Sequence, residues 1–199
     1  MARSADGVIK SWLISETACC VVSGTRTVTR CWCRSGAGVR RCSTGSTLPK
    51  ETGAEQERQG ILAELLGEIG AGSWIMPRLQ CDYGYLVRIG ANSFLNYDAV
   101  LLDCAPITIG DDVSVGPRAQ FLTALRPMDE HELRRRRWER AEPISVGDNV
   151  WFGGGVIVCA GVTAGANTVV GTGSVVTRDL PPGVFAAGNP ARVVRQLNR

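Results

Sequence analysis

This chain of 199 residues has few aromatic residues, a single histidine and little net charge. A formal net charge of +3 is too small to indicate a nucleic-acid partner by itself. No apolar run approaches the ~18 residues that a membrane-spanning helix needs, so no membrane span is predicted. Aromatic residues make up only 6% of the chain, as expected for a core of small β-branched side chains. The length suits one domain of medium size.

A six-residue repeat runs through the C-terminal half of the chain. Between Val146 and Pro181 an aliphatic residue, Phe or Ala recurs at every sixth position, and glycine usually follows it. The recurring residues are Val146, Phe152, Val158, Ala164, Val170 and Val176. A helix would need a period near 3.6 and a half-buried strand a period of 2. A fixed short period of this kind indicates a repeat architecture instead.

The repeat fits a parallel β-helix, in which each hexapeptide forms one flat side of a triangular coil. The sixth-position residue then points into the axis, and glycine tolerates the backbone geometry at the corners. The same pattern occurs earlier, at Ile89-Gly90, Leu95, Leu101, Ile109-Gly110, Val115-Gly116 and Phe121. A solenoid exposes its ends and flat faces, so caps or oligomerisation are expected.

The repeat divides the chain into segments. Residues 71–185 are the predicted β-helix, and residues 186–199 form a C-terminal tail. Residues 54–70 are predicted to form a short helical cap that ends at glycine. Its apolar stripe consists of Ile61, Leu62, Leu65, Leu66 and Ile69.

A charged excursion, residues 124–143, interrupts the β-helix. It contains the arginine run from Arg134 to Arg137, Trp138 and the only histidine, His131. Insertions at solenoid corners often build the working site. The arginine run by itself is typical of a solvated loop or helix face, and nucleic-acid binding is not predicted from it.

Several strings carry a resemblance to a known family. They are CDYGY (81–85), LNYDAVLLD (95–103), ITIGDDVSVGP (107–117), PISVGDNVWFGGG (143–155), GVTAGANTVVGTGSVVTRDLPPG (161–183) and AAGNPARVVR (186–195). From about Ala54 to Arg195, which is most of its length, the chain resembles the maltose/galactoside O-acetyltransferases, of the hexapeptide-repeat acyltransferase superfamily. The repeat alone marks the superfamily, whereas the combination of strings is specific to the sugar-acetylating branch.

The resemblance implies an all-β fold, a left-handed parallel β-helix, packed as a homotrimer. Active sites would lie in clefts between subunits, with the excursion reaching over them. The implied chemistry is acetyl transfer from acetyl-CoA to a sugar hydroxyl, with no metal. A hydroxyl needs a general base to take its proton, and the tetrahedral oxyanion needs donors. Free thiols and an acetyl-CoA substrate both favour the cytoplasm.

The resemblance also implies which residues hold acetyl-CoA. They are Gly154 and Thr172 along the pantetheine slot, Thr177 and Arg178 as further contacts, and Arg192 and Arg195 facing the phosphates. Guanidinium geometry suits phosphate groups. Each has a plainer interpretation, since Gly154 and Thr177 fit the repeat and the two late arginines fit a solvated tail.

On the acceptor side, Asp82 and Asn96 match residues that hydrogen-bond the sugar. Asp103 follows them in the LLD turn, where it is either a ligand or a turn residue. Cys104 stands where some family members carry an acid.

The catalytic position departs from the family pattern. The family reads Thr-Ala-X-His-Pro, and its histidine is the general base, whereas this chain has Arg126 at that position, between Thr123 and Pro127. Arginine stays protonated and cannot accept the proton. Losing a positioned base typically costs about 10²–10⁴ in rate. His131 is an alternative base, although an exposed loop histidine is the plainer interpretation.

Residues 1–53 lack the family's helical cap and hold five of the eight cysteines. The string RCSTGSTLPKE begins at Arg41, and it can be encoded so that a shifted frame reads VLDRFNATEG, similar to the family's cap. We therefore expect an out-of-frame translation of a normal cap, disordered as a chain. Sequencing the gene tests this. Zinc at Cys31, Cys33 and Cys42, or a secretory signal, is a weaker interpretation.

Three functions stay open. The first is an acetyl-CoA-dependent sugar O-acetyltransferase weakened by Arg126. The second is an inactive trimeric β-helix homologue that binds CoA or sugar, which turnover would separate from the first. The third is an acyltransferase for a non-sugar acceptor, and a panel of acceptors would reveal it.

Overall fold

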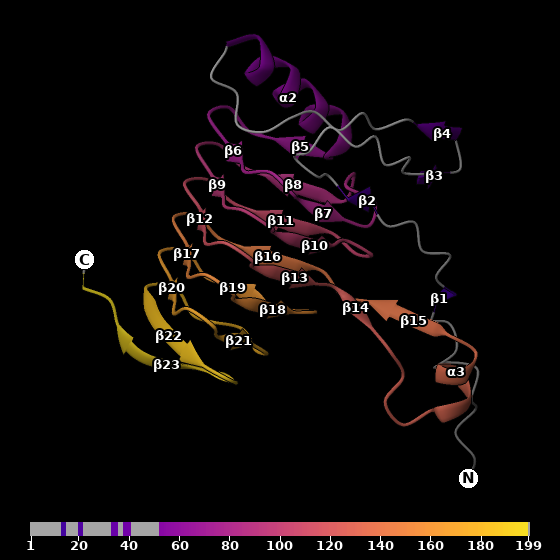
Figure 1. The fold of residues 1–199 in the computed structure, drawn as a ribbon. Helices are drawn as coiled ribbons and strands as arrows, with labels where there is room; N and C mark the ends of the chain where they lie inside the picture. The colour runs from indigo at the N-terminus through magenta and orange to yellow at the C-terminus, as the bar shows by residue number, and fades with distance from the viewer. Residues whose placement is uncertain (1–12, 15–19, 22–32, 36–37, 41–51, 199) are drawn as a thin grey trace.

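The computed structural model describes residues 13–14, 20–21, 33–35, 38–40 and 52–198. Most of them form short strands that stack into a parallel β-helix of about six coils (Figure 1). This confirms the predicted all-β solenoid. No helix among the described residues is long and apolar enough to cross a membrane.

Each coil contributes strands to three faces. The first face holds β5 (Glu68–Ile69), β8 (Val87–Ile89), β11 (Ile107–Ile109), β16 (Ile144–Val146) and β19 (Thr163–Ala164). The second face holds β6 (Trp74–Ile75), β9 (Phe94–Leu95), β12 (Ser114–Val115), β17 (Trp151–Phe152), β20 (Val169–Val170) and β22 (Val184–Gly188). The third face holds β7 (Gln80–Cys81), β10 (Val100–Leu102), β13 (Gln120–Leu122), β18 (Ile157–Cys159) and β21 (Val175–Val176).

The core is the column of side chains along the axis of the coils. Every recurring residue from Val146 to Val176 is at most 4% exposed, as the six-residue period predicts. Phe121 and Phe152, in adjacent coils, meet edge to face with ring centroids 5.5 Å apart. Such aromatic contacts add to the free energy gained by burying apolar area.

The coils have two lengths. Val146 pairs with Ala164, so a late coil spans three hexapeptides. Ile89 pairs with Ile109, so an early coil is longer than three hexapeptides by two positions. The extra positions lie where the third face turns into the next first face, which we call the 3–1 corner. The turn from the second face to the third is the 2–3 corner.

The excursion leaves the stack at the 3–1 corner and is an ordered hairpin rather than an irregular loop (Figure 1). Strand β14 (Ala124–Leu125) pairs antiparallel with β15 (Trp138–Ala141). Helix α3 (His131–Arg135) connects them at the far tip. Backbone pairing between β14 and β15 gives the hairpin the hydrogen bonds that an isolated loop would lack.

The C-terminal segment differs from the predicted tail. Strand β22 pairs parallel with β20 and crosses the expected boundary between residues 185 and 186. It then turns back into β23 (Ala191–Gln196), with which it pairs antiparallel. The stack therefore continues past Pro181 and ends in a hairpin on the second face.

The described residues of the N-terminal part form four short strands. Strand β1 (Leu13–Ile14) pairs with β15, and β2 (Cys20–Val21) pairs with β7. Strands β3 (Cys33–Ser35) and β4 (Gly38–Arg40) pair with each other. The remainder of residues 1–51 lies outside the described residues. The frame-shift and disorder hypotheses fall largely there, so they stay predictions.

Helix α2 (Thr52–Leu65) covers the end of the stack that holds β5 and β6 (Figure 1). It ends earlier than predicted because the first coil already begins with β5, which contains Ile69. Leu62 and Leu65 are buried against the core. The Arg58 guanidinium donates to the Ile75 carbonyl and lies 5.8 Å from the Trp74 ring centroid. The helix thus satisfies backbone groups on the edge strand β6.

We expect Arg58→Ala to lower the free energy of unfolding by about 1–2 kcal/mol, because it removes a hydrogen bond and a cation–π contact. Denaturant titration at fixed protein concentration measures this. Arg88→Ala, at an exposed arginine on β8, is the control and should change stability by less than ~0.5 kcal/mol. Equal effects of the two substitutions would show that the Arg58 contacts do not stabilise the stack.

Candidate active site

The extra positions of the early coils place a polar group at the 3–1 corner. Asp103 is fully buried there, and its Oδ1 accepts the backbone N–H groups of Asp82 at 3.0 Å and Tyr83 at 2.9 Å. One coil further on, Thr123 donates to the Leu102 carbonyl at 2.6 Å. Asp103 therefore ties the corners of two successive coils together, which favours its interpretation as a turn residue.

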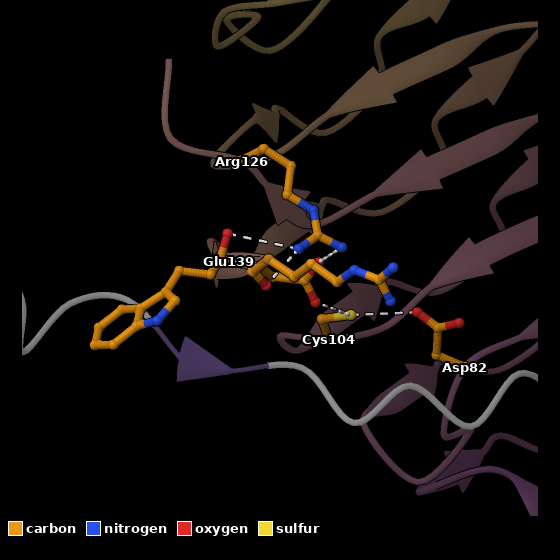
Figure 2. Close-up of polar contacts among 6 residues, drawn as sticks. Asp82, Cys104, Arg126 and Glu139 are labelled. Carbon is orange, nitrogen blue, oxygen red and sulfur yellow. Dashed lines mark hydrogen bonds and ion pairs between the residues drawn. The ribbon is translucent and has the colours of Figure 1, made fainter. Parts of the chain in front are cut away.

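Four side chains form what we call the corner cluster: Asp82, Cys104, Arg126 and Glu139 (Figure 2). The Cys104 thiol lies 3.2 Å from Asp82 Oδ2 and 3.9 Å from Glu139 Oε1. Arg126 Nη2 forms an ion pair with Glu139 Oε2 at 2.7 Å. The structure thus joins the predicted catalytic position to two of the predicted acceptor residues.

Arg126 is anchored by the opposite strand of the hairpin. Besides the ion pair, its Nη1 donates to the carbonyl of Arg137 at 2.7 Å. The Glu139 side chain is only 10% exposed, whereas that of Arg126 is 49% exposed. A buried carboxylate needs a paired charge, and Arg126 supplies it.

Sequence reasoning missed Glu139. The residue is one of several acids in a charged segment, and only the antiparallel pairing of β14 with β15 turns it towards position 126. The one feature of the sequence that could have pointed to Glu139 is that residues 138–141 can form a strand. In a strand every second side chain faces the same side.

Burial dominates the electrostatics of the cluster. It raises the pKa of Asp82, against the thiol hydrogen bond from Cys104, which lowers it, while the charge of Glu139 raises it further. Burial and the Asp82 carboxylate raise the pKa of Cys104 to about 12. The thiol therefore stays protonated near neutral pH and acts as a donor, not as a nucleophile. Burial also raises the pKa of Asp103, opposed by backbone N–H groups.

The 2–3 corner carries a second set of predicted residues. Gly154 and Thr172 lie there in successive coils, where Gly173 N donates to the Gly154 carbonyl at 2.9 Å. A Cβ at Gly154 would meet Pro117 no closer than 3.4 Å, so packing within the chain does not demand glycine. At the preceding Gly153 a Cβ would lie 2.6 Å from a backbone nitrogen. Gly154 thus leaves space on the outer surface of the corner.

Other predicted residues lie apart from the cluster. Asn96 is at the 2–3 corner of the second coil, where its Oδ1 accepts the Tyr97 N–H at 2.8 Å. Thr177 and Arg178 are exposed at the 3–1 corner after β21. Arg192 and Arg195 are exposed on β23, and within the described part of the chain their guanidinium groups donate to neighbouring backbone carbonyls. One chain therefore distributes the predicted site over two corners.

His131 lies away from the corner cluster. It belongs to α3, at the tip of the hairpin (Figure 1). Its Nδ1 is 2.9 Å from Arg134 Nη2, a residue of the same helix. Within one chain the structure does not bring this imidazole to the position of Arg126.

The chain resembles known acetyltransferases. Residues 143–178 match the family model described as the hexapeptide repeat of succinyl-transferase. The galactoside O-acetyltransferase of Escherichia coli (strain K12) is 38% identical over 143 residues, which cover 72% of this chain and 70% of that protein. The structure of a maltose O-acetyltransferase from Clostridium difficile 630 has a TM-score of 0.72 and 44% identity, covering 77% of this chain and 80% of that one.

A third relative was solved with a bound donor. It is a hexapeptide-repeat-containing acetyltransferase from Vibrio cholerae O1 biovar eltor, complexed with acetyl coenzyme A. It is 42% identical with a TM-score of 0.70, covering 73% of this chain and 79% of that one. The fold and the repeat thus define the class of hexapeptide-repeat acetyltransferases. Within that class, the chain belongs to the family of galactoside and maltose O-acetyltransferases.

We expect Cys104→Ala to raise the pKa of Asp82, because it removes the hydrogen bond that lowers this pKa. An NMR titration of the carboxyl carbon, assigned with Asp82→Asn, measures the change. Cys159→Ala removes a cysteine that lies elsewhere on the third face, and it should leave the Asp82 titration unchanged. A fall in the Asp82 pKa in Cys104→Ala would contradict the role of the thiol as a donor.

Proposed function

We propose that the chain is an acetyl-CoA-dependent sugar O-acetyltransferase of the maltose O-acetyltransferase type, slowed because Arg126 replaces the general-base histidine. The observation that carries this is the chain of contacts in the corner cluster. Arg126 pairs with the buried Glu139, and Cys104 lies between Glu139 and Asp82. The other donor and acceptor residues of the family pattern lie apart from this position in one chain, distributed over both corners. The acetyl-CoA substrate and the free thiols of Cys104 and Cys159 favour the cytoplasm.

The proposed roles follow from the chemistry of each side chain. The carboxylate of Asp82 and the amide of Asn96 bind sugar hydroxyls, which need both acceptors and donors. Gly154 and Thr172 leave room for the pantetheine arm. Arg192 and Arg195, both exposed, bind the phosphates of CoA. Thr177 and Arg178 extend the donor surface on the other corner.

We propose that the site is completed between copies of the chain. Both corners carry acceptor residues on the early coils, Asp82 on one and Asn96 on the other. Both carry donor residues on the late coils, Thr177 on one and Gly154 on the other. Copies that associate side by side, with parallel axes, would therefore bring acceptor residues together at one level and donor residues at another. A closed ring of three copies gives this arrangement at every contact.

The third face links the two corners and is the proposed contact surface. Its outward side chains are largely apolar and half-buried in one chain: Val100, Leu102, Leu122, Ile157 and Val175. The outward side chains of the first face are all polar and exposed: Glu68, Arg88, Thr108, Ser145 and Thr163. Burying the apolar face in a homotrimer is favourable, and the polar face can stay in water without loss.

A second candidate is a homologue that binds CoA or sugar without turnover. The Arg126–Glu139 ion pair favours it, because both groups that could act at position 126 are occupied by each other. A non-sugar acceptor is a third candidate, distinguished by acceptor preference alone.

We expect Arg126→His to raise kcat by about 10²-fold or more, the contribution of a positioned general base. Free-CoA release from acetyl-CoA is measured with maltose, glucose and a galactoside, next to the native chain. Arg88→His is the control for adding a histidine elsewhere. A native chain as fast as the variant would show that another residue is the base. If neither chain releases CoA with any acceptor, the proposed function is wrong.

We expect Ile157→Asp to dissociate the trimer, because it would bury an unpaired charge at the contact. Sedimentation velocity reports the mass of the particle at several concentrations. The matched control is Thr108→Asp on the polar first face, which should keep the trimer. A native chain that sediments as a monomer would contradict the proposed assembly.

A further inference from the structure

The corner cluster and the neighbouring Asp103 together contain three carboxylates, and they differ in what holds them. Asp103 is fully buried, and its Oδ1 accepts two backbone N–H groups. Its Oδ2 has no hydrogen-bond partner, but this atom is enclosed by the protein and cannot reach a bound acceptor. Glu139 is neutralised by Arg126 at 2.7 Å. Asp103 therefore has no free oxygen that an acceptor hydroxyl can reach, and the charge of Glu139 is already paired.

Asp82 has a different environment. Its Oδ2 accepts a hydrogen bond from the neutral Cys104 thiol at 3.2 Å, the weakest donor in the cluster. Its second oxygen points away from Cys104 (Figure 2). Of the three carboxylates, Asp82 alone has neither a paired cation nor backbone donors on its side chain among the described residues.

We propose that Asp82 is the general base of this chain, taking over the proton transfer that Arg126 cannot perform. The inference rests on the proposed function and deepens it, since the carboxylate that binds the acceptor hydroxyl is also placed to take its proton. Among the described residues, one oxygen of Asp82 is held by neither a cation nor a backbone donor, so this oxygen can accept the proton. A base must first be within hydrogen-bond reach of the proton, and binding the hydroxyl provides that.

The step balances without a further reactant. As the acceptor oxygen attacks the thioester carbonyl carbon, its proton moves to the free oxygen of Asp82. The tetrahedral intermediate collapses, the carbon–sulfur bond breaks, and Asp82 returns the proton to the leaving thiolate. The products are the acetyl ester and CoA. A carboxylate is a weaker base than an imidazole, so the native chain is slower than Arg126→His by the same reasoning.

The test is a double-mutant cycle of kcat with Asp82→Asn in the native chain and in the Arg126→His background. In the native chain Asp82→Asn should lower kcat by about 10²-fold or more, since it removes the base. In the Arg126→His background the new imidazole supplies the base. There the same substitution should lower kcat less than about 3-fold and act mainly through KM.

The dependence of kcat on pH gives an independent readout. The native rate should fall at low pH as Asp82 becomes protonated, and Asp82→Asn should lose this limb. The other groups that titrate next to Asp82 are Cys104, Asp103, Glu139 and Tyr83. Cys104→Ala should move the limb to higher pH, because the thiol hydrogen bond lowers the pKa of Asp82.

Two controls keep the test interpretable. Asp112→Asn changes an exposed aspartate at another corner and should leave kcat unchanged. The backbone φ of Asp112 is 56°, a value that asparagine also adopts. Circular dichroism melts and acetyl-CoA binding show whether Asp82→Asn is folded.

The outcomes are distinguishable. Equal losses of kcat in both backgrounds, or a change confined to KM, would make Asp82 a sugar ligand only and overturn the inference. The inference would also be overturned if Arg126→His is active but the native chain releases CoA no faster than the native chain carrying Asp82→Asn. In that case the proposed function would still stand. If no variant releases CoA, the proposed function fails and this inference fails with it.

Discussion

The in-register stacking of coils is the constraint on which the rest of the structure depends. Parallel strands hydrogen-bond to the same face of the next coil, so a side chain recurs in line with its counterpart one coil further on. The columns that point inward become the core, and those at the corners become candidate binding surfaces. The extra positions in each early coil widen the 3–1 corner, and Asp103 fills the widened turn by accepting backbone N–H groups.

The six-residue period was sufficient to predict the coil and its core, because burial in a solenoid depends on local spacing. Even Ala164, smaller than its neighbours in the column, is 1% exposed. The period does not reveal where helix α2 ends or that residues 184–196 form a hairpin, since both depend on pairing with distant strands. Glu139 was missed for the same reason: its contact with Arg126 exists only through the hairpin register.

The Arg126–Glu139 ion pair determines the chemistry at the corner cluster. Arg126 satisfies the buried Glu139 carboxylate, so the hairpin keeps its place against the stack. The guanidinium itself has no acceptor atom, so position 126 cannot take a proton. In the proposed mechanism the remaining carboxylate, Asp82, is held by a thiol that stays protonated because its pKa is raised to about 12.

A mixing experiment tests most directly whether sites form between copies. Native chain, with Arg126 and an intact donor slot, is refolded with an Arg126→His, Gly154→Trp variant, which has the base but a blocked slot. If one corner from each of two chains makes a site and the two proteins are mixed in equal amounts, about a third of the sites in mixed trimers, and so about a quarter of all sites, pair the new histidine with an open slot. The mixture should then release CoA at about a quarter of the Arg126→His rate. A rate equal to the sum of the two separate proteins would show that each chain forms its site alone.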